Sequence, residues 1–173
     1  MHAGRPLLHH AVQTLADVTG DVVVVLAPLA TEPLLPPGVP ARFARDPHEG
    51  EGPLAGAVAG LGAVDRELAV LAGGDMPGLS AGVVREMLRV ATESGVDAVA
   101  LRDGDRFRPL PVAVRTVTGR DEGRAVLQAG ERSLRAWLRS MRVAEIDEAS
   151  WAAIDPGRET LSDVDVPGDL ASP

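Results

Sequence analysis

Residues 70–80 read VLAGGDMPGLS, an apolar run that ends in two glycines, an acid, a methionine and a proline. Two structures fit this pattern: a glycine-rich loop around nucleotide phosphates, or the end of a buried strand that presents Asp75. A phosphate loop needs successive backbone N–H groups facing the anion. Asp75 would repel phosphate, and Pro77 has no N–H. The pattern therefore favours the strand end, where open α/β sheets bind ligands. Spacing alone leaves a metal site and a turn or capping role for Asp75 equally open.

Short apolar runs suited to buried strands alternate with segments of helical periodicity along the chain. The expected helices cover 6–18, 53–64, 80–94, 118–129 and 133–141, with a short helix around Trp151. The expected strands cover 21–27, 41–46, 67–73, 97–103, 108–115, 142–147 and 159–165. This order predicts one α/β domain over residues 1–173, with a mostly parallel sheet and one antiparallel excursion.

Composition excludes several classes of function. The chain has 173 residues and no cysteine, so disulfides, zinc–thiolate sites and cysteine nucleophiles are ruled out. Its net charge of −8 argues against a nucleic-acid partner or an anionic membrane surface. Without a signal peptide or an apolar run of membrane length, we expect a cytoplasmic protein and no membrane partner. All 17 basic residues are arginine, so a reaction that needs lysine must find it elsewhere.

Three further motifs carry acids or glycines. Asp46 follows an expected strand, and residues 52–56 (GPLAG) open an expected helix. Small residues there allow a ligand to approach closely, although tight packing of the helix on a sheet is the more common reason for them. Asp163 and Asp165 lie two apart on an expected strand and so share a face, which suits a cation or simple exposure to solvent. Residues 102–106 (RDGDR) read as a turn more readily than as a metal pair.

Taken together and in order, these stretches resemble the molybdenum cofactor guanylyltransferase family. The resemblance rests on GRPLLHHAVQTL (4–15), GPLAG (52–56) with Asp46 upstream, GGDMPGL (73–79), LQAGERSLRAWL (127–138) and SDVDVPGDL (162–170). It spans nearly the whole chain, and GPLAG is closer to the guanylyl branch than to the cytidylyl one. The implied fold is a three-layer, Rossmann-like nucleotidyltransferase with a mostly parallel sheet.

The resemblance also implies an activity and a set of site residues. The intact enzyme would transfer GMP from GTP to a molybdopterin-type cofactor and release pyrophosphate, with Mg²⁺ as cofactor. Asp75 would be the catalytic metal ligand, and Asp163 or Asp165 would complete the metal shell. Molybdoenzymes or cofactor-biosynthesis proteins are possible partners. The implied nucleotide-binding residues are Asp46, Gly52, Pro53, Leu54, Gly56 and Asp75, and the implied cofactor side has Arg106 and Pro109.

One part of the family pattern is not found in these residues. Family members carry a strand, a glycine-rich nucleotide loop and a catalytic lysine ahead of the position of Gly4. We therefore expect the 173 residues to be N-terminally truncated, because of a start codon placed downstream of the real one. A degenerate paralogue is the alternative.

Three other functions stay open at this stage. Cytidylyl transfer to the same cofactor and guanylyl transfer to phospholactate would reuse the Asp75 site with another base or acceptor. A non-catalytic paralogue would only bind the cofactor or a partner enzyme. Leu26-Ala27-Pro28 stands where family members often have asparagine, and Arg108-Pro109 replaces a common His-Pro.

Overall fold

The computed structural model describes residues 5–46 and 50–162. The helices are α1 (Leu7–Thr19), α2 (Pro53–Gly62), α3 (Ala81–Ser94), α4 (Thr116–Gln128), α5 (Leu134–Arg139) and α6 (Glu148–Ile154), followed by the 3₁₀ helix η1 (Glu159–Leu161). The strands are β1 (Val22–Leu26), β2 (Ala41–Arg45), β3 (Leu68–Leu71), β4 (Ala98–Asp103), β5 (Arg106–Arg115) and β6 (Val143–Ile146). No described helix is long and apolar enough to span a bilayer.

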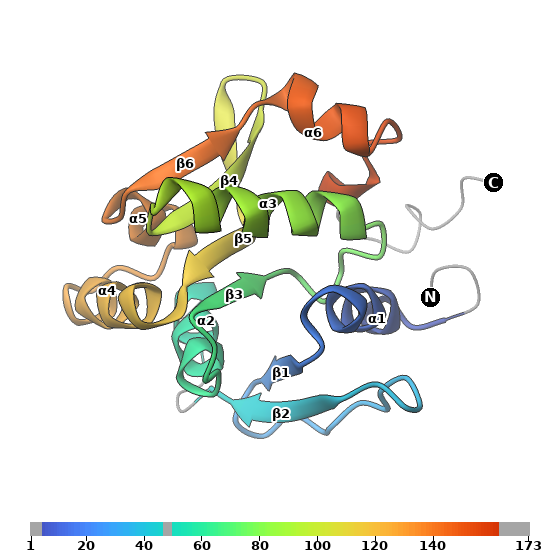
Figure 1. Cartoon of the computed structure of the whole chain (residues 1–173). Helices are drawn as coiled ribbons and strands as arrows, with labels where there is room; N and C mark the ends of the chain where they lie inside the picture. The colour runs from blue at the N-terminus through green and yellow to red at the C-terminus, as the bar shows by residue number, and fades with distance from the viewer. Residues whose placement is uncertain (1–4, 47–49, 163–173) are drawn as a thin grey trace.

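The strands form two separate sheets (Figure 1). The larger has the order β3-β5-β4-β6, in which β5 is antiparallel to both β3 and β4, and β6 is parallel to β4. The smaller consists of β1 and β2, which pair in parallel. Strands β3, β4 and β6 therefore share one direction, and β5 is the antiparallel excursion expected from the sequence.

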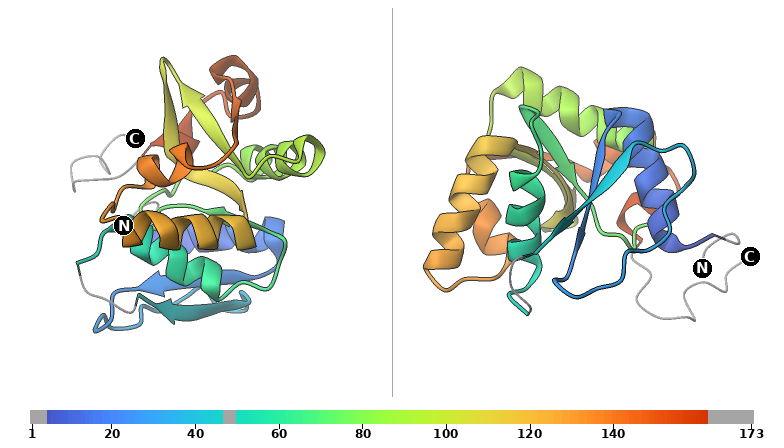
Figure 2. Two further views of the ribbon diagram at one scale, coloured as in Figure 1. Left: turned by 90° about the vertical axis from the view of Figure 1, so that its left-hand side faces the viewer. Right: turned by 90° about the horizontal axis from the view of Figure 1, so that it is seen from below.

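Helices cover both faces of the larger sheet, which gives three layers (Figures 1 and 2). On one face, Val99 and Leu101 of β4 pack with Val83 and Met87 of α3. On the other face, the buried residues Leu54, Leu61, Val112, Val114 and Trp137 bring α2 and α5 onto the sheet. Because successive strand residues point to opposite faces, β5 sends Ala113 to the first core and its two neighbours to the second. The α/β class and the layered fold are confirmed.

Local sequence signals set most element boundaries. Ser80 caps α3 through its side chain, which accepts from the Val83 N–H, and Gly95 ends that helix in the left-handed region. The turn between β4 and β5 contains Gly104 at φ 60°, so the RDGDR stretch forms a hairpin turn and not a metal pair.

One expected element is wrong. Residues 159–161 of the expected strand 159–165 form η1 instead. Arg158 adopts a left-handed conformation (φ 56°), and the Asp155 carboxylate accepts the Thr160 N–H. These local contacts curl the backbone before a strand can begin. Asp163 and Asp165, with the rest of 163–173, lie outside the described residues.

An ion pair joins the start of β4 to the residue before β6. Asp97 accepts from the Arg142 guanidinium at 2.9 and 3.1 Å and from the Arg142 backbone N–H at 3.0 Å. These hydrogen bonds, first those of the guanidinium and then that of the backbone, hold the pKa of Asp97 below its usual value.

We predict that Asp97→Asn lowers the free energy of unfolding by about 1 kcal/mol at pH 7. Because the folded pKa of Asp97 is depressed, its contribution is fully present above the usual pKa. It is lost as the pH falls through the lowered, folded value. Urea unfolding of both proteins from pH 7 to pH 2.5 measures this difference. A gap that stays constant at the acid end would show that the carboxylate's charge is not its source.

Candidate active site at the carboxyl ends of the strands

Residues 73–80 form the turn between β3 and α3. The Gly73 N–H donates to Met76 Sδ at 3.2 Å, and the Met76 N–H donates to the Gly73 carbonyl at 3.4 Å. Met76 is buried, whereas Asp75 beside it is exposed. The turn therefore has a fixed apolar anchor and carries one carboxylate into solvent. Because the Gly73 amide is engaged inside the turn, this stretch is a strand end and not a phosphate-cradling loop.

Gly73 lies directly under the Asp75 side chain. A Cβ there would lie 2.3 Å from Asp75 Oδ1, so the carboxylate folds back over the glycine. A Cβ on Gly74 would lie 3.3 Å from Leu8 Cδ1, which places α1 directly beside the turn. Any side chain at position 73 would displace the Asp75 carboxylate.

Asp46 lies at the carboxyl end of the smaller sheet. It follows β2, is partly exposed, and its N–H donates to the carbonyl of Leu26, the last residue of β1, at 2.9 Å. Arg45 next to it holds the loop after β1, donating to the carbonyls of Ala27, Pro28 and Ala30 at 2.9–3.3 Å. Sequence reasoning missed this role, since nothing local shows which carbonyls a long side chain will reach.

The GPLAG stretch begins α2. Gly52 has φ 80° and precedes Pro53 at the first helical position, and the N-terminus has no side-chain cap or acidic residue in its first turn. Pro53 has no N–H, and Leu54 and Ala55 after it are 0% and 4% exposed, so little of the backbone of this first turn is open to an anion. Gly56 faces Val25 of β1, with a Cβ–Cγ1 separation of 3.9 Å. Leu54, predicted from the sequence as a nucleotide contact, is 0% exposed and lies in the core between α2 and the sheet.

The residues before the acidic C-terminal motif dock on the Asp75 turn. The Ser80 N–H donates to Thr160 Oγ1 at 3.1 Å, and Thr160 is fully buried. A Cβ on Gly78 would lie 2.5 Å from the Glu159 carbonyl oxygen, so the two segments touch through their backbones. The chain therefore leaves η1 beside this turn, which agrees with a shared role for Asp75 and the acids that follow.

We predict that Thr160→Val destabilises the protein by roughly 1–3 kcal/mol, because an isosteric side chain leaves the Ser80 N–H unpaired in a buried place. Thr92→Val on the exposed face of α3 is the matched control, with an expected change within about 0.5 kcal/mol. Urea unfolding compares the two. Equal losses would mean that the Thr160 hydroxyl does not hold η1 on the turn.

The two cofactor-side candidates lie in the β4–β5 hairpin region. Arg106 is 75% exposed and its Nε is 3.7 Å from Asp105 Oδ1, whereas Pro109 is partly buried in β5. No hydrogen bond or ion pair within residues 5–46 and 50–162 joins either one to the Asp75 turn. Arg108 is better placed: its Nη2 donates to the Leu161 carbonyl at 3.4 Å, tying the hairpin to η1. In the sequence, Arg108 stood out only because Arg108-Pro109 replaces the His-Pro that is common in the family.

The exposed carboxylate of Asp75 suits a hard cation that takes most of its other ligands from water and from the phosphates of the enzyme's substrate. Among residues 5–46 and 50–162, no three His, Asp or Glu side chains gather into a group that could hold a metal ion by themselves. Mg²⁺ commonly binds through one or two carboxylates, waters and substrate phosphates. An exposed Asp75 carboxylate fits that mode of binding.

Comparison with known proteins adds the decisive observation. The family model for the MobA-like NTP transferase domain matches residues 1–146. The chain belongs to this family. It is a nucleotidyltransferase of the MobA-like type, as the resemblance of its motifs implied.

Two relatives of this MobA-like transferase carry names, and both are less than 30% identical to it. The chain is 27% identical over 169 residues to a "Probable molybdenum cofactor guanylyltransferase" of Chloroflexus aggregans, covering 96% of this chain and 78% of the relative. It is 24% identical over 146 residues to a "Molybdenum cofactor guanylyltransferase" of Shewanella amazonensis, covering 84% of this chain and 73% of the relative.

Solved structures support the fold. Molybdopterin-guanine dinucleotide biosynthesis protein A of Archaeoglobus fulgidus superimposes with a TM-score of 0.76 at 20% identity, over 98% of this chain and 84% of that one. A 2-C-methyl-D-erythritol 4-phosphate cytidylyltransferase of Thermus thermophilus gives 0.73 at 22% identity, over 98% and 88%. The same scaffold thus occurs with different nucleotides, and base choice must be tested directly.

Proposed function

We propose that this protein is a guanylyltransferase that transfers GMP from GTP to the terminal phosphate of a molybdopterin-type cofactor. The observation that carries the proposal is the exposed Asp75 carboxylate at the end of β3, in a chain whose named relatives are guanylyltransferases. A terminal oxygen of the acceptor phosphate attacks the α-phosphorus of GTP in line. The new P–O bond forms as the bond to the β-phosphate oxygen breaks, and pyrophosphate leaves with that electron pair.

In this proposal the protein's residues neutralise charge on the reacting phosphates and position the nucleotide. Asp75 would hold Mg²⁺, with Asp163 or Asp165 completing its shell; the ion, when bound, neutralises charge on the transferring and leaving oxygens. Asp46 would bind the nucleotide or the waters of the ion. Gly52, Pro53, Leu54 and Gly56 at the start of α2 would line the nucleotide site through the small side chains that GPLAG provides there.

The acceptor side is assigned to the hairpin. Within the described residues, the exposed Arg106 guanidinium has one ion-pair partner, the exposed Asp105, at 3.7 Å. An incoming anion could displace that weak contact at little cost. Pro109 would shape the backbone behind it.

Nucleotide selectivity tests the proposal. The protein is given the acceptor, Mg²⁺ and each of GTP, CTP, ATP and UTP in turn, and pyrophosphate is measured. We expect release with GTP alone, and only when the acceptor is present. Strict use of CTP would replace the guanylyl assignment by a cytidylyl one. Tight binding of the acceptor without turnover would support a non-catalytic paralogue.

A further inference from the structure

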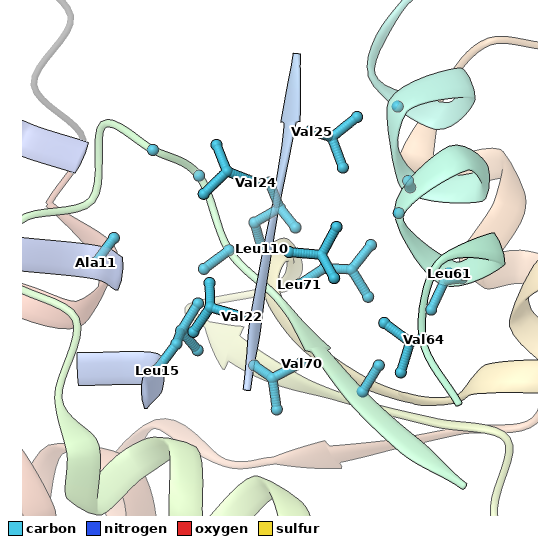
Figure 3. Close-up of a pocket in the computed structure, with 18 of the residues that line it drawn as sticks. Ala11, Leu15, Val22, Val24, Val25, Leu61, Val64, Val70, Leu71 and Leu110 are labelled. Atoms are coloured by element: carbon cyan, nitrogen blue, oxygen red, sulfur yellow. The ribbon is translucent and has the colours of Figure 1, made fainter. Parts of the chain in front are cut away.

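A cavity of about 330 Å³ lies between β1 and β3, with side chains of α1 and α2 around it (Figure 3). The lining residues labelled in Figure 3, such as Val24, Leu71 and Leu110, are all aliphatic. Such side chains offer no charge to the phosphate of an acceptor. The charged groups that could position an acceptor lie instead on the β4–β5 hairpin and on α6.

Helix α6 lies beside the β4–β5 hairpin, whose tip leads into Arg106 (Figure 1). The Gly104 N–H at the tip donates to Glu148 Oε2 at 2.9 Å. The Trp151 indole N–H donates to the Arg102 carbonyl of β4 at 2.7 Å, and Trp151 itself is buried. Two hydrogen bonds therefore hold the hairpin on one short helix, one of them at the tip.

Glu148 also holds the segment that follows α6. Its other carboxylate oxygen, Oε1, accepts from the Arg158 guanidinium. The same guanidinium lies over the Trp151 ring, with its Cζ 5.2 Å from the ring centroid. Arg158 is the left-handed residue directly before η1. The two carboxylate oxygens of Glu148 thus bind different segments, the hairpin tip and the start of η1.

From η1 the contacts continue to the turn that carries Asp75. Thr160 of η1 accepts the Ser80 N–H, and the backbone of Glu159 lies against Gly78. A continuous series of contacts therefore runs from the hairpin tip through Glu148, Arg158 and η1 to the Asp75 turn. The residue proposed for the acceptor, Arg106, lies near one end of this series, and the residue proposed for the metal lies near the other.

The exposure of the Glu148–Arg158 pair argues against a role in stability alone. Their side chains are 39% and 47% exposed, and ion pairs this open to water contribute little to folding. The hydrogen bond to Gly104 is different, because a carboxylate is a strong acceptor and the Gly104 N–H lies in the turn between the paired residues Asp103 and Arg106. Loss of Glu148 should therefore loosen the tip more than it weakens the fold.

We propose that Glu148 is a positioning residue for the transfer reaction. It holds the hairpin that carries Arg106 in a fixed place relative to the Asp75 turn, so that a bound acceptor phosphate lies in line with the α-phosphorus of GTP. Glu148 acts through Gly104 and Arg158 and not by contact with a substrate. The inference rests on the guanylyltransferase function proposed above, with the acceptor on the hairpin.

Steady-state kinetics of two variants test the proposal, with GTP and the molybdopterin-type acceptor varied in turn. We expect Glu148→Ala to raise the KM for the acceptor roughly 10-fold and to leave the KM for GTP unchanged. Glu148→Gln keeps an oxygen for the Gly104 N–H and loses the charge, so its rise should be smaller. Glu93→Gln breaks an exposed ion pair with Arg89 near the other end of α3. As the matched control, it should change neither KM.

Amide hydrogen exchange gives a readout that does not depend on the reaction. In Glu148→Ala the Gly104 amide should exchange roughly 10-fold faster, while the Val99 amide in the core of β4 keeps its rate and the Tm changes by less than about 4 °C. Unchanged exchange at Gly104, or equal rises in the two KM values, would overturn the positioning role and leave the proposed function intact. Failure of the unchanged protein to transfer GMP would overturn the function, and the role of Glu148 with it.

Discussion

Replacing Asp75 by asparagine is expected to lower turnover by roughly 100- to 1,000-fold, the size of effect that follows loss of one preorganised charge-stabilising group. Asparagine keeps the shape of the side chain over Gly73, so the turn and its Met76 anchor should survive. What is lost is the negative charge that would hold the cation. Steady-state rates of pyrophosphate release over a series of Mg²⁺ concentrations measure the effect.

Asp121→Asn is the matched control, since Asp121 is an exposed carboxylate on α4 with 56% of its side chain accessible. Its turnover should equal that of the unchanged protein. Wild-type turnover of Asp75→Asn at saturating Mg²⁺ would remove Asp75 from the mechanism. A loss of turnover that is explained by a fall in Tm, so that the variant is unfolded in the assay, would assign the residue a structural role instead.

Trp137→Ala is expected to cost roughly 3–5 kcal/mol of unfolding free energy, the largest effect on stability that we predict. Trp137 is fully buried between α4 and the sheet, and its Nε1 donates to the Gly119 carbonyl at 2.9 Å. Gly119 and Gly123 give the ring its place: a Cβ at Gly123 would lie 3.4 Å from Nε1. Alanine leaves a cavity and removes this hydrogen bond.

Two variants separate these causes, with circular dichroism following unfolding in urea. Trp137→Phe keeps most of the volume and loses the hydrogen bond, so its loss should be smaller than that of alanine. Leu34→Ala removes a side chain that is 88% exposed and should change stability by less than about 0.5 kcal/mol. A Trp137→Ala loss no larger than that of Leu34→Ala would contradict the packing described for this core.

Local pattern predicted much of this fold because local forces determine those features. The β-branched run before Pro28 became β1, the serine at position 80 became a cap, and Asp-Gly between two strands became a hairpin. The C-terminal part was harder to predict: residues 159–161 look extended in sequence, but Asp155 and the left-handed Arg158 turn them into η1. A polar contact five residues away decided the conformation against strand propensity.

Sequence reasoning could single out Asp75 in the candidate site, but not the residues that hold the surrounding segments in place. Asp75 could be found because an acid after a buried strand and two glycines lies at the ligand-binding edge of a sheet. Arg45, Arg108 and Thr160 could not, because their partners are carbonyls and amides up to 80 residues away. Leu54 belongs to the GPLAG motif, and the helical period turns its side chain into the core.

The fate of the α-phosphorus of GTP tests the central claim most directly. The protein is incubated with Mg²⁺, the molybdopterin-type acceptor and GTP labelled at either the α or the γ position. A nucleotidyltransferase predicts that the α label enters the acceptor in a one-to-one ratio with pyrophosphate, and that the γ label leaves in the pyrophosphate. Transfer of the γ label to the acceptor, or release of inorganic phosphate with no label transferred, would contradict it.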